Sequence, residues 1–315
     1  MNLNNETVFI INPMAQGGKA GKKWFDIFPL VQQIFPESSF LKTTCEGEAL
    51  TFAKECMVNE KVKKIISVGG DGTNNEVING LFQEKKILRK DISFGILPMG
   101  TGSDFSRTLK IPQEISKALK VLKDEKKIMC DVGYVKFLNK NSDERYFLNV
   151  FSFGISGHSA QLIHQNELKK NRLTYFTQAL KSLFQYEAKN IELSSNSDKL
   201  FEGASFLVAL ANGCYFGSGM KLSPEADIQS GLLDIVIVTG QNRPSLIKKF
   251  ISLYSGSHID GKKVQLFRKK EVKATSSEVI FSEYDGEAAP QIPFEASCLK
   301  GALPLIVPED FKGSQ

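Results

Sequence analysis

Two glycine-rich stretches and one acidic turn have the residue types needed for phosphate chemistry. The stretches are GGDGT at 69–73 and GTGSD at 100–104, and the acidic turn is DGE at 285–287. Backbone N–H groups at a strand-to-helix joint bind anions, and glycine lets a phosphate approach the backbone closely. An aspartate inside such a turn suits magnesium, which prefers hard oxygen ligands. The pattern therefore predicts a phosphate site with magnesium nearby.

Each glycine-rich stretch also has a purely structural interpretation. Thr73 with Glu76, and Thr101 with Asp104, have the spacing of a capping box at the start of a helix. Two such joints in one half of a chain are less easily explained by chance than one, so phosphate binding is favoured. Lys19 adds a point charge that suits a phosphate, although a solvated surface lysine is the alternative.

The elements that must position these motifs are strands and helices in alternation. Apolar runs that predict strands lie at 7–12, 40–44, 63–70 and 92–98, with helical patterns between them. Such alternation with short connections predicts a parallel α/β sheet. Ligands bind at the carboxyl ends of strands in such sheets. We therefore expect the glycine-rich stretches and the loop NPMAQGGK, which follows the first strand, to meet at one edge.

The second half of the chain has a different pattern. Its strand-like segments often alternate apolar and polar residues and are separated by turn signals, which predicts a largely antiparallel β domain. Two helical patterns interrupt it, at about 158–186 and 244–255. We place the boundary near 124–130, with a first domain at 1–126 and a second at 127–305.

Composition limits the class of protein. The chain has 315 residues, a formal net charge of +5 and a pI of about 8.8, a mild basic balance that requires no nucleic acid. Five cysteines without CxxC spacing favour reduced thiols in a cytoplasmic protein. The N-terminus lacks the pattern of a signal peptide, and no apolar run reaches the roughly 20 residues of a membrane-spanning helix. Any membrane contact is therefore expected to be peripheral.

At this level of detail the chain resembles a known family. GGDGTNNEV, PMGTGSDFSR and YDGE resemble motifs of the diacylglycerol-kinase catalytic family, which includes bacterial lipid kinases and the sphingosine and ceramide kinases. The resemblance covers nearly the whole chain, although GGDGT alone also occurs in NAD kinases and phosphofructokinases. It implies an N-terminal α/β nucleotide domain similar to those enzymes, a C-terminal β-sandwich and an active cleft between them. It also implies that residues 306–315 return to the first domain.

The motifs and the resemblance together assign roles to single residues. The residues expected to line ATP are Asn12, Lys19, Thr43, Gly69, Gly70, Asp71, Gly72, Thr73, Asn75, Gly100, Thr101, Gly102 and Asp104. Asp71 would either hold metal or order the loop. Glu287 matches the family's proton acceptor, which takes the proton of a lipid hydroxyl as that hydroxyl attacks the γ-phosphorus. Alone, Asp-Gly predicts a hairpin turn, but the upstream motifs favour the base. Asp131 is expected to face Glu287 across the cleft, where one carboxylate raises the pKa of the other.

Two positions depart from the family pattern. Ser103 stands where the family has asparagine, and it still offers a hydroxyl for nucleotide contact. Ser230 stands where the family has an aspartate that helps to hold a structural magnesium. The other matching positions are Asp227 and the carbonyl of Leu232, and serine is a weaker magnesium ligand than a carboxylate. Asp227 offers a compensating carboxylate, so the sequence leaves this metal site open.

The sequence therefore predicts an ATP- and Mg²⁺-dependent lipid kinase that is cytoplasmic and peripherally associated with the membrane. An apolar stripe with lysines nearby, at 169–189, either packs on the sandwich, which we favour, or faces lipid. The alternatives for function are a soluble NAD kinase-like enzyme and a non-catalytic nucleotide- or lipid-binding regulator. The identity of the lipid and the oligomeric state, including a homodimer, are left open.

Overall fold

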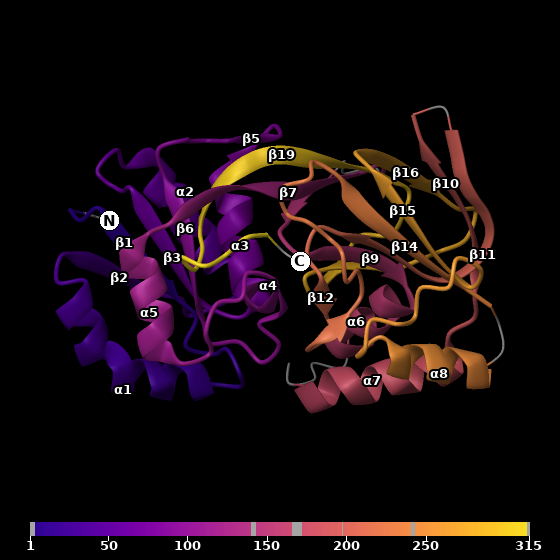
Figure 1. Cartoon of the computed structure of the whole chain (residues 1–315), viewed down its shortest axis with the longest axis horizontal. Coiled ribbons are helices and arrows are strands. Elements are labelled where there is room, and N and C mark those ends of the chain that lie inside the picture. The colour runs from indigo at the N-terminus through magenta and orange to yellow at the C-terminus, as the bar shows by residue number, and fades with distance from the viewer. Residues whose placement is uncertain (1–3, 140–142, 166–171, 197, 241–242, 314–315) are drawn as a thin grey trace.

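The structure is a computed structural model of the chain, shown in Figure 1. It describes residues 4–139, 143–165, 172–196, 198–240 and 243–313. The two halves of the sequence form the two sides of an elongated molecule, with the N-terminal α/β part on the left of Figure 1 and the β-rich part on the right.

The first half forms the predicted parallel sheet with helices around it. In spatial order its strands are β6 (Ser93–Pro98), β3 (Lys64–Gly69), β1 (Thr7–Ile11) and β2 (Ser38–Lys42). Its helices are α1 (Lys19–Ile34), α2 (Glu48–Val58), α3 (Asp71–Leu81), α4 (Asp104–Thr108) and α5 (Ile115–Asp124). A short hairpin joins β4 (Phe82–Gln83) to β5 (Lys86–Ile87).

The apolar runs explain why these strands lie at the centre. Val8, Phe9 and Ile10 are fully buried, as strands of a parallel sheet covered on both faces must be. After β1 the chain passes to β2 on one side of it and then to β3 on the other, so the strand order reverses at β1. Open α/β sheets bind ligands at such a reversal, outside the carboxyl ends of the strands. Asn12 and Gly70 follow those ends.

The second half is antiparallel, as predicted. Its strands are β7 (Lys127–Phe137), β8 (Glu144–Phe147), β9 (Val150–Gly154), β10 (Lys189–Ser195), β11 (Asp198–Ala211), β12 (Tyr215–Phe216), β13 (Met220–Lys221), β14 (Leu233–Thr239), β15 (Val264–Lys269), β16 (Glu271–Thr275), β17 (Ser282–Tyr284), β18 (Glu287–Ala289) and β19 (Phe294–Ile306). The helices are α6 (Ile155–Gln165), α7 (Arg172–Gln185) and α8 (Arg243–Ser252). The single helical pattern expected at 158–186 therefore contains two helices.

One strand connects the two halves. β19, the yellow strand along the top of Figure 1, pairs with β16 and β7 and then in parallel with β6, where Leu305 lies opposite Phe94. The residues after it pack on the first half, since Phe311 belongs to the first hydrophobic core and Lys126 Nζ donates to its carbonyl at 2.9 Å. The sequence did not predict this continuous sheet. We keep the division into 1–126 with 306–315, and 127–305, as a proposal.

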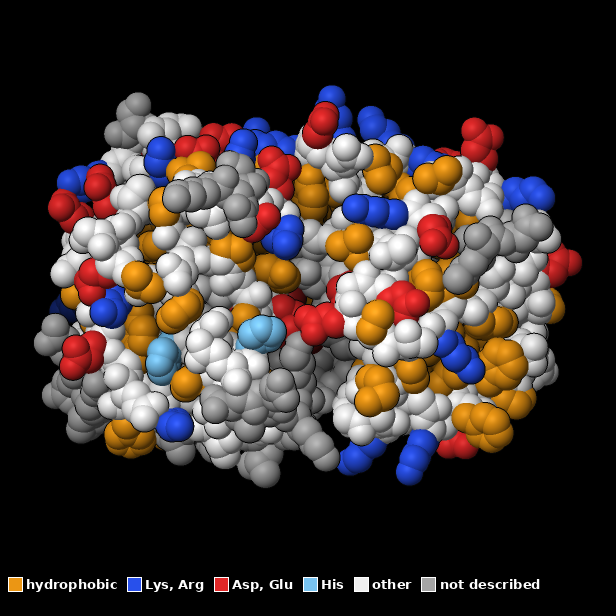
Figure 2. All heavy atoms as spheres, turned by 180° about the vertical axis from the view of Figure 1, so that it is seen from behind, with side chains coloured by type: hydrophobic (Ala, Val, Ile, Leu, Met, Phe, Trp, Pro, Cys, Tyr) orange, Lys and Arg blue, Asp and Glu red, His pale blue; other side chains and the backbone are white. Residues whose placement is uncertain are grey.

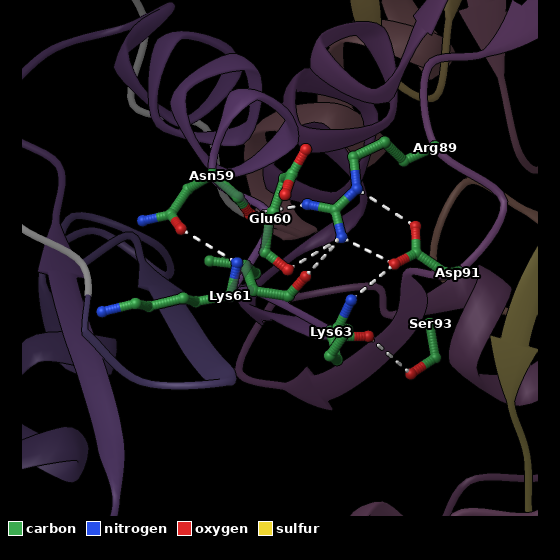
Figure 3. Close-up of polar contacts among 8 residues, drawn as sticks. Asn59, Glu60, Lys61, Lys63, Arg89, Asp91 and Ser93 are labelled. Atoms are coloured by element: carbon green, nitrogen blue, oxygen red, sulfur yellow. Dashed lines mark hydrogen bonds and ion pairs between the residues drawn. The ribbon is translucent and has the colours of Figure 1, made fainter.

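At the amino ends of the parallel strands, opposite the glycine-rich loops, Arg89 links two loops through hydrogen bonds (Figure 3). The Arg89 guanidinium donates to the carbonyls of Asn59 at 2.6 Å and Val62 at 3.0 Å, and pairs with Asp91 at 2.7 Å. Lys63 pairs with the same Asp91 carboxylate at 2.8 Å. These bonds tie the loop before β3 to the loop before β6, so they hold the two strands that end at the glycine-rich motifs.

Candidate active site

A cavity of about 940 Å³ lies between the glycine-rich loops and the β-rich half. Among the predicted site residues, those that line it are Asn12, Thr43, Gly70, Asp71, Gly72, Thr73, Gly100, Thr101, Gly102, Asp104 and Glu287. They come from five separate segments of the chain, and the carboxyl ends of the parallel strands bring most of them together. On the face drawn in Figure 2, acidic side chains gather near the middle, where the two halves meet.

Asp71 joins the two glycine-rich motifs. It lies in the first turn of α3, and its carboxylate accepts hydrogen bonds from the amides of Asp104 at 3.0 Å and Phe105 at 3.2 Å. These are the first amides of α4, so Asp71 caps the helix of the other motif. Both carboxylate oxygens are used in this way, which favours the expected role of ordering the loop over that of holding metal.

The two predicted capping boxes are wrong. α3 begins at Asp71 and α4 at Asp104, and neither has a capping hydrogen bond from the side chain of its own N-cap residue. Glu76 instead accepts from the amide of Ala49 at 3.2 Å and so caps α2. The two acids of the expected boxes thus bond other segments, Glu76 the start of α2 and Asp104 the amide of Ser218.

Close backbone contact explains the glycines. A Cβ on Gly100 would lie 2.2 Å from the Cα of Gly70, so any side chain there would push the two loops apart. Gln16 Nε2 donates to the carbonyl of Gly100 at 2.7 Å, and Asn12 Nδ2 donates to Thr73 Oγ1 at 3.0 Å. Three loops therefore hold one another at the strand ends, with backbone at the cavity wall.

The acidic turn is both a hairpin and a cavity wall. Asp285 and Gly286 have φ values of 49° and 90°, which is the geometry of a two-residue type I′ turn between β17 and β18. Glu287 follows the turn and reaches the other half of the molecule, because a Cβ on Gly72 would lie 2.8 Å from Glu287 Oε1. The structure thus places a carboxylate of the β-rich half directly against the GGDGT loop.

Asp285 anchors that turn, a role the sequence did not reveal. Its carboxylate accepts from the Asn75 side chain at 2.9 Å and from the amide of Val150 at 2.9 Å. Burial raises its pKa to about 6. Because one carboxylate bonds both α3 and the start of β9, it fixes the position of Glu287 relative to the first half.

Burial also raises the pKa values of other acidic residues of the site. Burial, and then the charge of Asp71, raise the pKa of Asp104 to about 7, and burial raises the pKa of Asp71 itself. Burial raises the pKa of Glu76 as well. Asp104 accepts a hydrogen bond from the amide of Ser218 at 2.7 Å, which links α4 to the β-rich half.

Several predicted residues lie elsewhere. Lys19 is exposed on α1, Gly69 lies beneath Thr73, and neither lines the cavity. Asn75 is buried and bonds Asp285 and the carbonyl of Tyr146, so it is a link between the halves and no wall of the cavity. The predicted contacts of these three residues with ATP are not supported by their positions.

Asp131 does not face Glu287 as expected. It is fully buried on β7, away from the cavity, and its two carboxylate oxygens accept from the amides of Gly231 and Gly301. Burial raises its pKa, and the nearby charge that adds to this shift is that of Asp227. Asp131 holds the loop after residue 227 to the sheet, because a buried carboxylate needs such donors.

The residues of the expected structural metal site do not fit a cation. Ser230 Oγ lies 2.9 Å from the carbonyl oxygen of Asp227 and 3.3 Å from that of Leu232, between two oxygens that a metal would share. The Asp227 carboxylate turns back to the amide of Gln229 at 3.1 Å. Within the described ranges no group of three or more His, Cys, Asp or Glu is placed to hold a metal. The Ser230 hydroxyl is thus bonded within its own loop, and Asp227 is the single carboxylate that the loop at 227–232 offers.

Comparisons with known proteins identify the family. Residues 6–135 match the diacylglycerol kinase catalytic domain, and residues 149–307 match the YegS C-terminal NAD kinase beta sandwich-like domain. A protein of Chromohalobacter salexigens named "Probable lipid kinase YegS-like" is 30% identical over 267 residues, covering 84% of this chain and 81% of that protein. The chain belongs to the diacylglycerol kinase family of lipid kinases.

Other members of this lipid kinase family match along nearly their whole length. A diacylglycerol kinase of Bacillus subtilis is 29% identical over 308 residues, which is 96% of each chain. The crystal structure of a Bacillus anthracis diacylglycerol kinase superposes with a TM-score of 0.72 at 25% identity, covering 98% of both chains. Yeast NADH kinase, at 12% identity and a TM-score of 0.54, covers 97% of this chain and 83% of its own, and shares the fold alone.

The lipid kinase cavity has a second part, whose residues the sequence did not single out. Apolar side chains line it, among them Phe206, Leu207, Phe250 and Leu253, from β11, α8 and the residue that follows α8. Leu183 of α7 also lines it, whereas Phe184 of the predicted stripe is 61% exposed. Lys169 and Lys170 lie outside the described residues. Of the stripe, Leu183 therefore packs and Phe184 faces outward, and the side chains of Leu173, Phe176 and Leu180 lie outside the described residues.

Proposed function

We propose that the enzyme transfers the γ-phosphate of ATP, bound as its Mg²⁺ complex, to the hydroxyl of a lipid alcohol such as diacylglycerol. The observation that supports this most is a single cavity that joins the glycine-rich loops, Glu287 and an apolar chamber. A lipid kinase must bring the phosphates, the base and the lipid together. Here the residues proposed for all three line one cavity.

The glycine-rich loops would hold the triphosphate. The amides around Gly70, Gly72 and Gly102 form the wall at the carboxyl ends of β3 and β6, where backbone N–H groups bind phosphate. Mg²⁺ would neutralise the charge that develops on the transferred group. Thr43 and Thr101 on the same wall offer hydroxyls to the nucleotide.

Glu287 would act as the base. Its carboxylate lies against Gly72, so an acceptor hydroxyl between Glu287 and the phosphates is near both. The hydroxyl oxygen forms a bond to the γ-phosphorus, its proton passes to Glu287, and the bond from the γ-phosphorus to the β–γ bridging oxygen breaks to release ADP. Most of the acceleration would come from positioning and charge neutralisation.

The apolar chamber favours a lipid acceptor over NAD. A dinucleotide presents ribose, phosphate and amide groups, which bury poorly against Phe206, Leu207 and Phe250. Incubation with γ-labelled ATP and separate pools of lipid extract and NAD tests this choice. We expect label in a phospholipid, identified by mass spectrometry; labelled NADP alone, or binding of ATP with no transfer, would overturn the proposal.

We further propose that α7 and α8 contact the membrane from which the lipid comes. The two helices lie side by side at the bottom of the β-rich half in Figure 1. Phe184 and Ile251 are exposed there at 61% and 65%, beside the exposed Lys181, while Leu183 and Phe250 of the same helices line the cavity. No helix among the described residues is long and apolar enough to span a bilayer. Co-sedimentation with anionic vesicles, reduced in a Phe184→Ser/Ile251→Ser variant, is the expected result for a cytoplasmic enzyme that binds at the surface.

A further inference from the structure

Three hydrogen-bonded polar side chains lie at the cavity wall, two of them lining it, between the turn that precedes the base and the apolar chamber. Glu283 of β17 is 7% exposed and lines the cavity, as does Ser156 in the first turn of α6. Ser152 of β9, which lies opposite Glu283 in the strand pairing, bonds both of them. Ile155, the neighbour of Ser156, belongs to the wall of the apolar chamber.

Glu283 is connected to the base at its other end. Its Oε1 bonds the Ser152 hydroxyl, and its Oε2 accepts from the amide of Gly286 at 2.8 Å. Gly286 immediately precedes Glu287 in the type I′ turn. The three side chains therefore extend from the turn that positions the base to the wall of the apolar chamber.

The hydrogen bonds that link Glu283, Ser152 and Ser156 must all run in the same direction. Ser152 Oγ lies 2.7 Å from Ser156 Oγ and also bonds Glu283, but it has a single hydrogen to donate. If Glu283 is ionised, Ser152 donates to it and Ser156 donates to Ser152. If Glu283 is protonated, it donates to Ser152, Ser152 donates to Ser156, and the Ser156 hydrogen is left for the cavity.

We propose that Glu283, acting through Ser152, sets whether Ser156 offers a hydrogen-bond donor to the lipid, and that its protonated form selects lipid alcohols with an ester carbonyl beside the reacting hydroxyl. This inference rests on the proposed lipid kinase function and deepens it. Ser156 is the residue that touches the lipid, and Glu283 is a positioning residue. An ether-linked lipid lacks the carbonyl that Ser156 would bond, although its shape is nearly the same.

The surroundings of Glu283 favour the protonated form. Burial raises its pKa to about 7, and the charges of Asp285 in the turn and Glu287 on β18 act in the same direction. Of the elements packed against β17, β9 has no titratable residue, and the described part of α6 has no lysine or arginine. His158 of α6 bonds Ser182 of α7, and His164 is exposed. The described residues of these elements therefore place no lysine or arginine beside Glu283, and Lys249 of α8, which lines the same cavity, pairs with Asp260 at 2.8 Å.

Two substitutions test the roles of protonated Glu283 and of the Ser156 hydroxyl. Glu283→Gln keeps the shape and mimics the protonated acid, because its amide oxygen accepts from Gly286 and its NH₂ group donates to Ser152. Ser156→Ala removes the group that would bond the lipid. Ser159→Ala is the matched control, because Ser159 also lines the cavity. Its hydroxyl bonds Ile155 and Ser182, and it takes no part in the hydrogen bonds between the three side chains.

The test compares dioleoylglycerol with its ether analogue, dioleyl glycerol diether, in the same detergent micelles between pH 5.5 and 8.5. The ratio of kcat/KM for the two lipids cancels any effect of pH on the base. We expect the wild type to prefer the ester about five- to tenfold at low pH, the size of one hydrogen bond, and to lose this preference as pH rises through 7. Glu283→Gln should hold the preference at all pH values, Ser156→Ala should abolish it, and Ser159→Ala should behave as the wild type.

A preference that does not change with pH, or that survives Ser156→Ala, would overturn the inference while leaving lipid kinase activity intact. Failure of the wild type to phosphorylate either lipid would instead contradict the proposed function. Thermal unfolding of each variant confirms that it is folded. If Glu283→Gln does not fold, the wild-type pH profile and Ser156→Ala still decide the question.

Discussion

The carboxylate of Asp71 caps the helix that begins at Asp104, 33 residues further along the chain, with an N–H···O distance of 3.0 Å between donor nitrogen and acceptor oxygen. This bond makes the two glycine-rich motifs one unit. Each motif would otherwise present a free loop at its own strand end. Because the first motif supplies the cap of the second, both loops are held at the cavity wall in a fixed relation.

Asp71→Ala tests this relation. It leaves the amides of Asp104 and Phe105 without an acceptor, so we expect the free energy of unfolding to fall by about 1–3 kcal/mol and the KM for ATP to rise. Asp71→Asn keeps one acceptor and should lose less. Chemical denaturation and ATP titration measure both effects; an alanine variant as stable as the wild type would show that the cap is unimportant.

The pKa of Asp104, about 7, predicts how stability depends on pH. The folded chain keeps this proton to higher pH than the unfolded chain, whose carboxyl has the ordinary value of 3.8, so the contribution to stability is full below that value and is lost as pH rises through 7. Asp104→Asn has no proton to lose. We expect its free energy of unfolding to fall less between pH 5 and 8, by on the order of 2 kcal/mol. Equal slopes in the two proteins would contradict the assignment.

Gly72→Ala separates catalysis from stability. The added Cβ would lie 2.8 Å from Glu287 Oε1, the end of a flexible side chain, so the fold can adjust by moving that carboxylate. Alanine also favours the helix at this position in α3. We expect unfolding at the same temperature or higher, with kcat at least about tenfold lower, because small displacements of a reacting group are costly. Unchanged kcat would place the base elsewhere.

Ser230→Asp should give the loop at 227–232 a second carboxylate for binding Mg²⁺. In the wild type, the Ser230 hydroxyl bridges the carbonyls of Asp227 and Leu232. A carboxylate cannot donate to them, but it can bind a cation that both carbonyls also contact. We expect Mg²⁺ to raise the melting temperature of the variant by a few degrees more than that of the wild type, with Ser230→Asn as the neutral control. An equal effect of Mg²⁺ on all three proteins would show that the wild-type loop already binds it.

The fold was accessible from the sequence because its signals are local. Continuous apolar runs such as 64–69 and 93–98 mark strands buried on both faces, and glycines after them mark joints to helices. What the sequence could not show depends on long-range pairing. Nothing in β19 indicates that its last residues join a parallel sheet while its first residues pair with antiparallel strands.

The candidate site, like the fold, could be predicted from the sequence only in part. The motifs located the loops and Glu287, because the glycine-rich joints and the DGE turn can be recognised as short stretches of sequence, although the contacts they make are long-range. Asp131 and Asn75 have the residue types of site groups, yet their side chains satisfy buried amides and carbonyls in other segments. Asp285 and Glu283 lie beside the recognised Glu287, but only the strand pairing of β17 with β9 and β18 shows what each contacts.

The most direct measurement of the central claim is transfer of labelled γ-phosphate from ATP to diacylglycerol by the wild type, by Glu287→Gln and by Glu309→Gln, an exposed control near the C-terminus. We predict that Glu287→Gln folds and binds ATP normally while kcat falls by about 10²–10⁴-fold, and that Glu309→Gln retains wild-type turnover. A Glu287→Gln enzyme with near-wild-type turnover would contradict the account.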